Sequence, residues 1–267
     1  MDSLDSYSPI NYSKWDFSGL GANICPQPKI TDLAEHKFPV LNDIERRIWR
    51  EAIPFQDMRD DEGQGEFVSL FALKLLDYAN GKREVAVPAA ILHDTGFYRM
   101  PKAGDVHRAA AKAGTVENVD YRKVHQDFGV EIARDILGRL NYEPSHIEEI
   151  CDIIGDHDTR LKPATESGQV MRDADILWRF TVPSYLLYKD LHHEFGPGAS
   201  GLLQHWEKKE LLKGADKEHT ASRFYSPAAL QIARIEIANA LMRVYPDESP
   251  GLLRQNYFKE LEVVRSQ

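Results

Sequence analysis

The sequence contains only two cysteines, Cys25 and Cys151, among 267 residues. Two cysteines cannot form the framework of several disulfides that stabilises many small secreted proteins. Cys151 lies on the apolar face of a predicted helix, so we expect a reduced core residue. No stretch approaches the roughly 20 apolar residues of a transmembrane helix, and the acidic residues 1–5 are unlike a secretory signal peptide. We therefore expect a cytoplasmic protein that does not enter a membrane.

Positive charge is also scarce, because 33 Lys and Arg residues face 42 Asp and Glu residues, a formal net charge of -9 at pH 7. Phosphate backbones are bound mainly by Lys and Arg, so this balance argues against a nucleic acid polymer as partner and favours small substrates. The sequence also lacks a Gly-x-x-x-x-Gly-Lys-Ser/Thr phosphate loop, a dinucleotide-binding glycine fingerprint and a Gly-x-Ser-x-Gly nucleophile elbow. P-loop, Rossmann-type and serine hydrolase chemistry therefore have no support.

Strand patterns are nearly absent, whereas apolar residues recur at helical spacing along most of the chain after residue 40. The sequence therefore predicts an all-α protein, with helices at 41–53, 64–80, 86–95, 120–141, 144–158, 169–181, 183–194, 199–213, 226–244 and 250–265. Residues 1–40 are rich in Ser, Pro, Asn and Gly, and we expect an irregular arm that lies over the domain or is partly disordered.

We expect residues 41–181 to form one domain and residues 182–267 to form a helical extension packed on it. Large apolar side chains of the extension could cover the core or form a homodimer face: Tyr185, Leu186, Leu187, Trp206 and Leu211. Covering the core is the interpretation that we prefer.

The most informative segment is 89–96, where an apolar helical run ends in the adjacent residues His93 and Asp94, just before Gly96. Neighbouring helical residues point in different directions, so both can reach one ion only near a helix end, where the backbone can adjust. A cation can bind a neutral imidazole and a carboxylate together. Alone the His-Asp pair is weak evidence for a metal site, because a hydrogen-bonded core histidine is the commoner explanation.

Three further segments place ligand-type residues on apolar helical faces. His125 borders the apolar stripe of its helix, and His157 comes one turn after Ile154. Asp173 and Asp175 alternate with apolar residues, so at least one carboxylate must face the core and needs a partner there. Each residue alone is explained as an ordinary polar residue, but the ordered set is far more specific.

With these motifs the chain resembles the HD-domain superfamily of metal-dependent phosphohydrolases and related oxygenases, over roughly residues 60–180. The matching segments are LHDTG at 92–96, HQDFGVEI at 125–132, GDHD at 155–158 and RDADIL at 172–177. The resemblance implies an HD-domain helical bundle, which we expect at residues 41–181, with the C-terminal helical extension added to it.

The resemblance also implies one or two divalent metal ions, with Mn, Mg, Fe, Co and Ni as the candidates. The implied ligands are His93, Asp94, His125, His157 and Asp175. Asp94 would bridge two ions where two are present, and the second ion would take both later histidines. The last ligand is usually the second acid of an Asp-x-Asp pair, so Asp175 is preferred and Asp173 is the alternative.

One position departs from the family, in which a histidine normally stands on the helix before the His-Asp pair. The spacing places Gln64 at that position. An amide oxygen can bind a hard cation or hydrogen-bond a metal-bound water, but it is a poorer ligand for zinc or iron. The ion next to Gln64 is therefore the one in doubt, and Glu66 or His107 could substitute.

Residues 98–123 carry an excess of positive charge in an otherwise acidic chain, including Arg99 and Lys102. Over a metal site these charges would suit a small anionic substrate, because Arg binds phosphate and carboxylate groups through two hydrogen bonds. A solvated loop without a specific role explains them equally well. Arg160 follows His157 within one turn and is the best single candidate for an anion contact, so Arg160, Lys102 and Arg99 are the predicted substrate-binding residues.

The first functional interpretation is metal-dependent hydrolysis of a small phosphate ester or nucleotide, with Asp94 as a catalytic metal ligand. Asp158 or Asp127 could orient or deprotonate the attacking water, and Asp158 is preferred because it neighbours a ligand. The second is a diiron oxygenase of the same superfamily that cleaves a carbon bond in a small anionic or polyol substrate, against which the lost histidine counts. The third is a degenerate HD domain that binds a ligand or partner without turnover, although buried polar groups that lack a partner are costly to keep.

Overall fold

The computed structural model describes residues 4–12, 41–56, 63–100, 117–188, 196–211 and 224–266, with only the backbone described at 5, 117–121, 187–188 and 209–211. Every regular element in these ranges is a helix or helical turn, and no strand occurs among them. The predicted all-α class is therefore confirmed. None of the helices in the described ranges is long and apolar enough to cross a bilayer.

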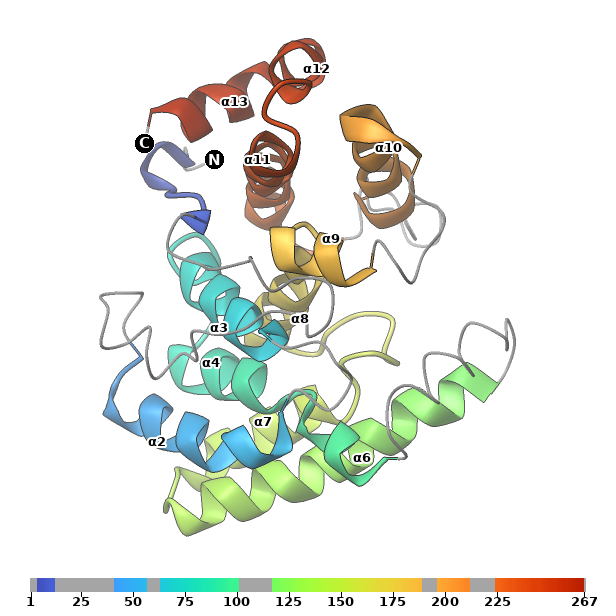
Figure 1. The fold of residues 1–267 in the computed structure, drawn as a ribbon. Coiled ribbons are helices and arrows are strands. Elements are labelled where there is room, and N and C mark those ends of the chain that lie inside the picture. The colour runs from blue at the N-terminus through green and yellow to red at the C-terminus, as the bar shows by residue number, and fades with distance from the viewer. Residues whose placement is uncertain are drawn as a thin grey trace.

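The helices form a bundle in which α3, α4 and α8 lie between α2, α6 and α7 on one side and α9 to α13 on the other (Figure 1). In chain order they are α2 (Asp43–Ala52), α3 (Gln64–Leu75), α4 (Arg83–Leu92), α6 (Glu117–Arg139), α7 (Pro144–Ile154), α8 (Glu166–Trp178), α9 (Val182–Tyr188), α10 (Gly198–His205), α11 (Pro227–Val244), α12 (Ser249–Asn256) and α13 (Phe258–Arg265). Shorter turns include η3 (Ile53–Phe55), η4 (Thr95–Arg99) and the π-helical segment Trp206–Leu211.

Helix α4 is the centre of the bundle, because all its residues from Val85 to Leu92 are buried. The predicted start at residue 86 was wrong, since α4 begins at Arg83 and has Pro88 in its interior. Proline has no N–H to donate to the carbonyl of Glu84 four residues earlier. The Tyr142 hydroxyl donates to that carbonyl at 2.7 Å instead, which compensates for the missing helical hydrogen bond.

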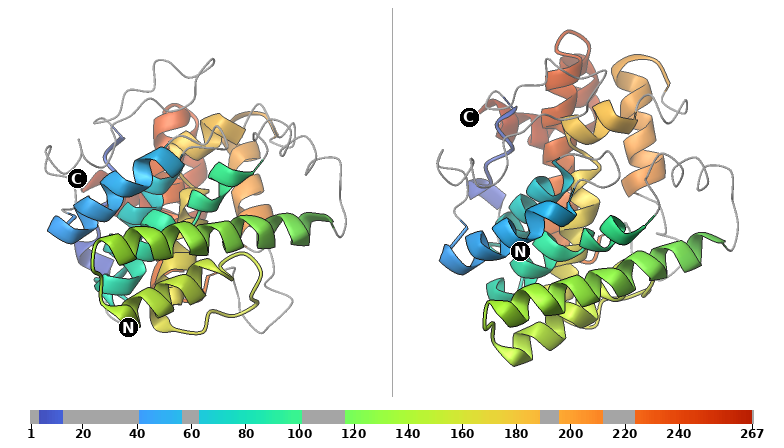
Figure 2. Two further views of the ribbon diagram at one scale, coloured as in Figure 1. Left: turned by 90° about the horizontal axis from the view of Figure 1, so that it is seen from below. Right: turned by 60° about the horizontal axis from the view of Figure 1, so that its bottom comes forward.

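Helices α6 and α7 form a hairpin at the lower edge of the molecule, where α6 runs across its full width (Figure 2). Their connection has Asn141 in the left-handed region at φ 53°, a conformation that Asn tolerates better than most residues. The Tyr142 N–H donates to the Leu137 carbonyl and closes this turn. The hairpin returns the chain along α6, so the segment after α7 comes back beside the middle of α6.

The N-terminal segment that is described, residues 4–12, lies against the core instead of projecting from it. Tyr7, Ile10 and Tyr12 are buried, and residues 13–40 of the predicted arm lie outside the described residues. The carboxylate of Glu236 on α11 accepts hydrogen bonds from the Tyr7 hydroxyl at 2.6 Å and from the Ile10 N–H at 3.0 Å. A buried acid on α11 therefore anchors the start of the chain.

The C-terminal part differs from the prediction in one respect, because the single helix predicted at 250–265 is two helices, α12 and α13, separated at Tyr257. Trp206 is buried and Tyr185 hydrogen-bonds to Tyr245 within the chain. These contacts cover the core, while the side chains of Leu187 and Leu211 lie outside the described residues. The division at residue 182 and the homodimer stay predictions.

Replacing Tyr7 by phenylalanine tests the anchor at Glu236. Tyr7→Phe removes a donor from a fully buried carboxylate, so we expect the free energy of unfolding to fall by about 1–3 kcal/mol at pH 7 in urea titrations. Burial raises the pKa of Glu236, and the Tyr7 hydrogen bond lowers it. Because the folded-state pKa of Glu236 is raised, this group contributes its full stabilisation below its unfolded-state pKa. That contribution is lost as the pH rises through the folded-state pKa. Losing the Tyr7 hydroxyl raises the folded-state pKa of Glu236 further, so the destabilisation caused by Tyr7→Phe grows with pH.

The matched control is Tyr78→Phe, because the Tyr78 hydroxyl meets the exposed Ser6 hydroxyl. We expect this variant to change the unfolding free energy by at most about 0.5 kcal/mol. Equal effects of the two substitutions would contradict a role for Glu236 as the anchor.

Candidate metal centre

Helix α4 ends at Leu92, and His93 and Asp94 follow where the chain turns into η4. Asp94 has φ -100° and ψ 4°, which lies outside α-helical geometry. The two side chains are thereby released from the fixed offset of consecutive helical residues. His93 Nε2 lies 3.3 Å from Asp94 Oδ2, so the adjacent residues do converge at a helix end.

Glycine at position 96 allows η4 to lie directly on the backbone of α6. A Cβ atom on Gly96 would be 1.8 Å from the His125 carbonyl oxygen and 2.5 Å from the Gly129 backbone nitrogen. Gly129 itself lies close to this turn, since a Cβ there would be 3.3 Å from the His93 carbonyl oxygen. Two glycines therefore bring the end of α4 into backbone contact with α6, and with it the His-Asp pair beside His125.

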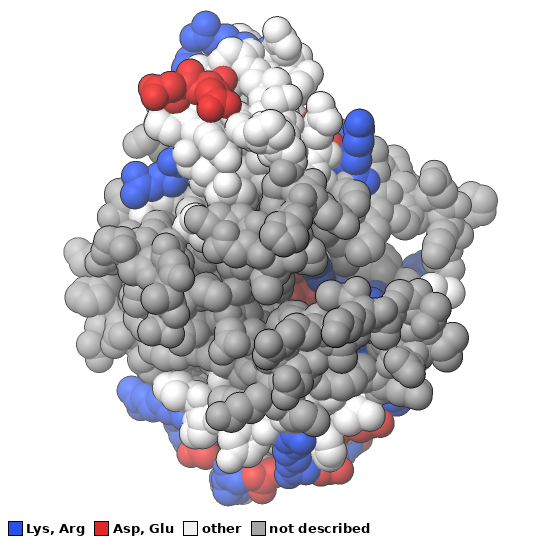
Figure 3. Space-filling model, turned by 45° about the vertical axis from the view of Figure 1, so that its right-hand side comes forward, with Lys and Arg blue, Asp and Glu red and all other residues white. Residues whose placement is uncertain are grey.

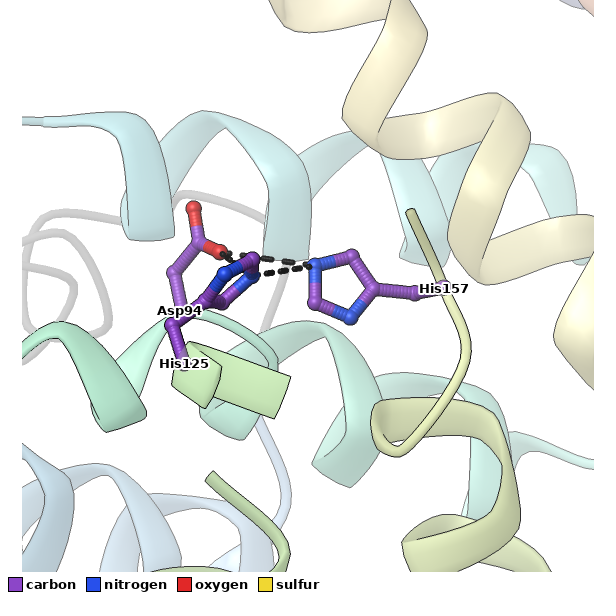
Figure 4. A group of neighbouring side chains, drawn as sticks. All are labelled: Asp94, His125 and His157. Carbon is purple, nitrogen blue, oxygen red and sulfur yellow. Dashed lines mark hydrogen bonds and ion pairs between the residues drawn. The ribbon is translucent and has the colours of Figure 1, made fainter. Parts of the chain in front are cut away.

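Asp94, His125 and His157 point toward one another from the end of α4, from α6 and from the segment after α7 (Figure 4). Their facing atoms form a nearly equilateral triangle: His125 Nε2 is 3.4 Å from His157 Nε2, and Asp94 Oδ1 is 3.6 and 3.5 Å from these two nitrogens. A point equidistant from the three atoms is about 2.0 Å from each, which matches metal–imidazole and metal–carboxylate bonds. The residues present therefore fit a divalent metal ion.

The hydrogen bond at His157 Nδ1 supports the fit of these residues to a metal ion. His157 Nδ1 lies 2.9 Å from the Ile154 carbonyl, so Nδ1 carries the proton and Nε2 offers its lone pair to the triangle. Burial would lower the pKa of His157, but the carboxylates of Asp158 and Asp94 raise it above the ordinary value. These carboxylates therefore favour the protonated imidazole when no cation is present, and a metal ion at Nε2 would compete with that proton.

A second group of ligand-type atoms adjoins the triangle. His93 Nδ1 lies 2.8 Å from the Ala90 carbonyl, and its Nε2 lies 3.6 Å from Asp175 Oδ1 in addition to Asp94. Burial lowers the pKa of His93, but the two carboxylates raise it well above the ordinary value; His93 in turn holds the pKa of Asp175 low against the effect of burial. Gln64, which the sequence spacing predicts at the position of the family's histidine, donates from Nε2 to Asp175 Oδ1 at 3.3 Å. Gln64 therefore faces the site.

Asp173, the alternative to Asp175, has other surroundings. Asp173 lies on the opposite side of α8, where its carboxylate accepts hydrogen bonds from the backbone N–H groups of Tyr225 and Ser226 at 2.9 Å each. Burial raises its pKa to about 7. Asp173 thus holds the entry into α11, and the structure places only Asp175 beside His93. Glu66, which was predicted as a possible substitute for the histidine missing at Gln64, is buried on α3 and is not among the atoms of the triangle, so that role stays a prediction.

Asp158 and Asp127, the two candidates for the base that acts on the attacking water, also differ in their distance from the site. Asp158 Oδ2 lies 3.6 Å from His125 Nε2 and 3.9 Å from His157 Nε2, at the edge of the triangle. Asp127 instead pairs with Lys123 one turn earlier on α6, and both side chains are more than half exposed. The structure therefore brings Asp158 to the site and leaves Asp127 on the outer face of α6.

Arg160 has carboxylate partners of its own. Its guanidinium lies 2.5 Å from Asp156 and 3.2 Å from Asp152, both on the segment around the end of α7. A substrate anion would have to compete with these two acids for the guanidinium. The two ion pairs explain Arg160 as a residue that stabilises the end of α7. Its role in substrate binding stays a prediction.

The other predicted anion contacts lie in or beside the segment that is not described. Arg99, at the end of η4, pairs with Glu131 and lies over the Phe128 ring. Lys102 and His107 fall outside the described residues. On the face shown in Figure 3, acidic and basic side chains alternate along the lower edge.

Phe97 and Gln126 are parts of the site that the sequence analysis did not predict. The Phe97 ring stacks on the His125 imidazole, with centroids 4.1 Å apart and planes 13° apart. Gln126 is fully buried next to His125 on α6 and meets the backbone of His157 and Asp158. The position of Phe97 directly after the His-Asp-Thr-Gly motif could have suggested a role in the site. The contact of Gln126 with His157, 31 residues further along the chain, could not be predicted from a local sequence pattern.

Residues 67–179 match the family model described as HD domain. This stretch contains the whole Asp94, His125 and His157 triangle as well as His93 and Asp175, and Gln64 lies just before it. Comparisons with curated proteins and with solved structures gave no significant match. The match confirms, for residues 67–179, the resemblance seen in the sequence, and together with the metal triangle it supports a metal-dependent hydrolase in general terms.

Gly96→Ala tests the backbone contact that assembles the site. The added methyl group must push η4 away from α6, so we expect a loss of about 1–3 kcal/mol in unfolding free energy and a weaker affinity for Mn²⁺ in isothermal titrations. Gly138→Ala is the matched control, because nothing lies within 4 Å of a Cβ at that helical position. It should raise stability by about 0.5–1 kcal/mol and leave Mn²⁺ affinity unchanged. Normal metal binding by Gly96→Ala would show that the contact does not position the ligands.

Proposed function

We propose that this protein is a metal-dependent hydrolase of the HD superfamily that acts on a small phosphate ester or nucleotide. The observation that carries the proposal is the convergence of two imidazole nitrogens and one carboxylate oxygen on a single point. Such atoms repel one another in a buried site unless a cation or protons lie between them. The match of residues 67–179 to the HD domain supports hydrolysis as the reaction class.

Asp94, His125 and His157 would hold the ion, and Phe97 and the Ile154 carbonyl keep two of the rings in place. When bound, a divalent ion supplies polarisation of a phosphoryl oxygen and makes a water molecule acidic enough to attack near neutral pH. The Asp158 carboxylate lies beside the two ligand nitrogens and its side chain is 35% exposed. It can accept the proton of the attacking water and pass it to solvent, which is the role of a general base.

Substitution of Asp158 tests this role. We expect Asp158→Asn to lower kcat by about 10²–10⁴-fold while the bound metal is retained, because an amide cannot accept the proton. The measurement is steady-state hydrolysis of a panel of phosphomonoesters and nucleotides by Mn²⁺-loaded protein, with metal content determined on the same samples. Asp127→Asn is the control and should behave as wild type, since Asp127 is exposed and paired with Lys123.

Asp94→Ala should abolish both metal binding and hydrolysis, because it removes the oxygen that faces both histidines. Full metal content in this variant would refute the proposed centre. Full activity of Asp158→Asn would refute only the assignment of the base.

We propose Arg99, Lys102 and Arg160 as contacts of the substrate anion. Support comes from the position of Arg99 at the end of η4, the turn that carries Asp94. Arg160 follows His157 closely but forms ion pairs with Asp152 and Asp156. It would bind the substrate anion only if one of these ion pairs broke. An Arg fork suits phosphate oxygens, which agrees with the proposed substrate class.

A second ion, if present, would lie between His93, the other oxygen of Asp94, and Asp175. We propose that this position binds metal more weakly than the triangle. The Gln64 N–H points at Asp175 Oδ1, which is the oxygen that faces His93. An N–H donor there competes with a cation for the same oxygen, and an amide is a poorer ligand than imidazole for iron or zinc.

Gln64→His should raise the affinity of this second position, because it places a nitrogen donor beside His93 and Asp175. The measurement is titration of Fe²⁺ and Mn²⁺ into metal-stripped wild type and variant, with the expected rise from about one ion toward two per chain. Gln231→His, on the exposed side of α11, is the control for an added histidine. Identical titrations of wild type and Gln64→His would contradict the second position.

The diiron oxygenase remains the second candidate, and one observation favours it. Three histidines surround the Asp94 carboxylate, and imidazole-rich sites suit iron. O₂ consumption by the Fe²⁺-loaded protein separates the candidates, because an oxygenase reaction consumes O₂ and hydrolysis does not. A degenerate binding module would take up no metal.

A further inference from the structure

We infer that Gln126 is a positioning residue of the metal centre, whose carboxamide fixes the backbone of His157 and Asp158 relative to His125. This inference rests on the proposed metal site and adds to it the group that sets its spacing. Gln126 directly follows His125 on α6 and is fully buried. One position of α6 therefore supplies a ligand, and the next holds the segment that carries the other histidine.

We assign the Gln126 carboxamide in the orientation that gives each of its atoms a partner of the opposite kind. Its oxygen then accepts hydrogen bonds from the backbone N–H groups of His157 and Asp158, both at 2.8 Å. The amide nitrogen donates to the Arg122 carbonyl at 3.2 Å and to the Thr159 hydroxyl at 3.0 Å. In this orientation each atom of the carboxamide meets partners of the opposite kind, and its two acceptor and two donor capacities are all used. The side chain thus bridges α6 and the segment 157–159.

The segment needs such a bridge because α7 has ended before it. The last residue of α7 is Ile154, and residues 155–159 form turns. The N–H groups of Thr159 and Arg160 donate to the Asp156 carbonyl, which leaves those of His157 and Asp158 to Gln126. A buried N–H requires an acceptor, so the amide oxygen determines where this part of the turn lies.

The bridge acts on the metal triangle through both ends. The His157 ring is oriented by the Ile154 carbonyl at Nδ1, and its backbone is held by Gln126, so neither rotation nor translation of the ring is free. The same hydrogen bonds place Asp158 at the edge of the triangle. The 3.4 Å separation of the histidine Nε2 atoms is therefore set by a direct link between their own backbone segments.

Side chains of similar size cannot replace this carboxamide completely. Methionine matches its length but accepts no backbone hydrogen bond of comparable strength. Glutamate keeps an acceptor oxygen for the two N–H groups, but it loses the amide donors to Arg122 and Thr159. The two substitutions therefore separate the acceptor function, which would position the site, from simple filling of space.

The experiment compares Gln126→Met, Gln126→Glu and the control Thr159→Val, which leaves the amide oxygen bonds intact. Co²⁺ is titrated into each metal-stripped protein and followed by its visible absorption, and amide hydrogen exchange at His157 and Asp158 is measured by NMR without metal. Gln126→Met should weaken Co²⁺ binding about 10–100-fold, shift the Co²⁺ spectrum and speed exchange at both amides at least tenfold. Gln126→Glu should recover part of both losses, and Thr159→Val should bind Co²⁺ within about twofold of wild type.

Wild-type Co²⁺ affinity and spectrum in a folded Gln126→Met or Gln126→Glu protein with fast exchange would overturn the positioning role, because the bridge would then be only structural. Slow exchange at both amides in Gln126→Met would overturn the bridge itself. If Gln126→Met does not fold, the acceptor-retaining Gln126→Glu carries the test, and its affinity must lie below that of wild type. Absence of Co²⁺ uptake by wild type would instead refute the proposed metal site, while exchange would still report the bridge.

Discussion

The backbone contact between η4 and α6 is the constraint on which the site depends. At Gly96 the two backbones lie so close that a single methyl group would meet the His125 carbonyl oxygen at 1.8 Å. This contact joins the end of the central helix α4, where His93 and Asp94 are, to the helix that carries His125. The α6–α7 hairpin then brings His157 to the same place. Three segments from separate parts of the chain thus meet at one triangle of donor atoms.

Electrostatics explains why this arrangement calls for a cation. Three imidazoles and the carboxylates of Asp94 and Asp175 are packed into a region where the histidines are almost completely buried. The carboxylates raise the pKa values of His93 and His157, so protons stabilise the group when no metal is bound. A divalent ion can replace those protons at the triangle, with distances near those of ordinary metal bonds. The site is therefore a place where metal and protons compete, and metal affinity should fall in acid.

Much of the fold and part of the site could be predicted because they depend on local patterns. Helical periodicity identified most of the helices and predicted that His125 and His157 are buried, and the His-Asp pair marked the end of α4. The helix predicted at 144–158 ends at Ile154, so His157 lies in the turn after it and not on a helical face. Other features depend on distant partners. Pro88 lies inside α4 because Tyr142 supplies a hydrogen bond to Glu84 from 58 residues away. Asp173 could not be separated from Asp175 by sequence, since its partners are backbone N–H groups at the start of α11.

The most direct test of the account is a crystal of the protein soaked in Mn²⁺, with anomalous diffraction used to locate the ion. The account predicts an anomalous peak within bonding distance of Asp94 Oδ1, His125 Nε2 and His157 Nε2, about 2.0–2.2 Å from each atom. A weaker peak between His93 and Asp175 would be consistent with it. Ordered Asp94, His125 and His157 side chains that face one another in a Mn²⁺-saturated crystal, with no anomalous peak between them, would contradict the central claim.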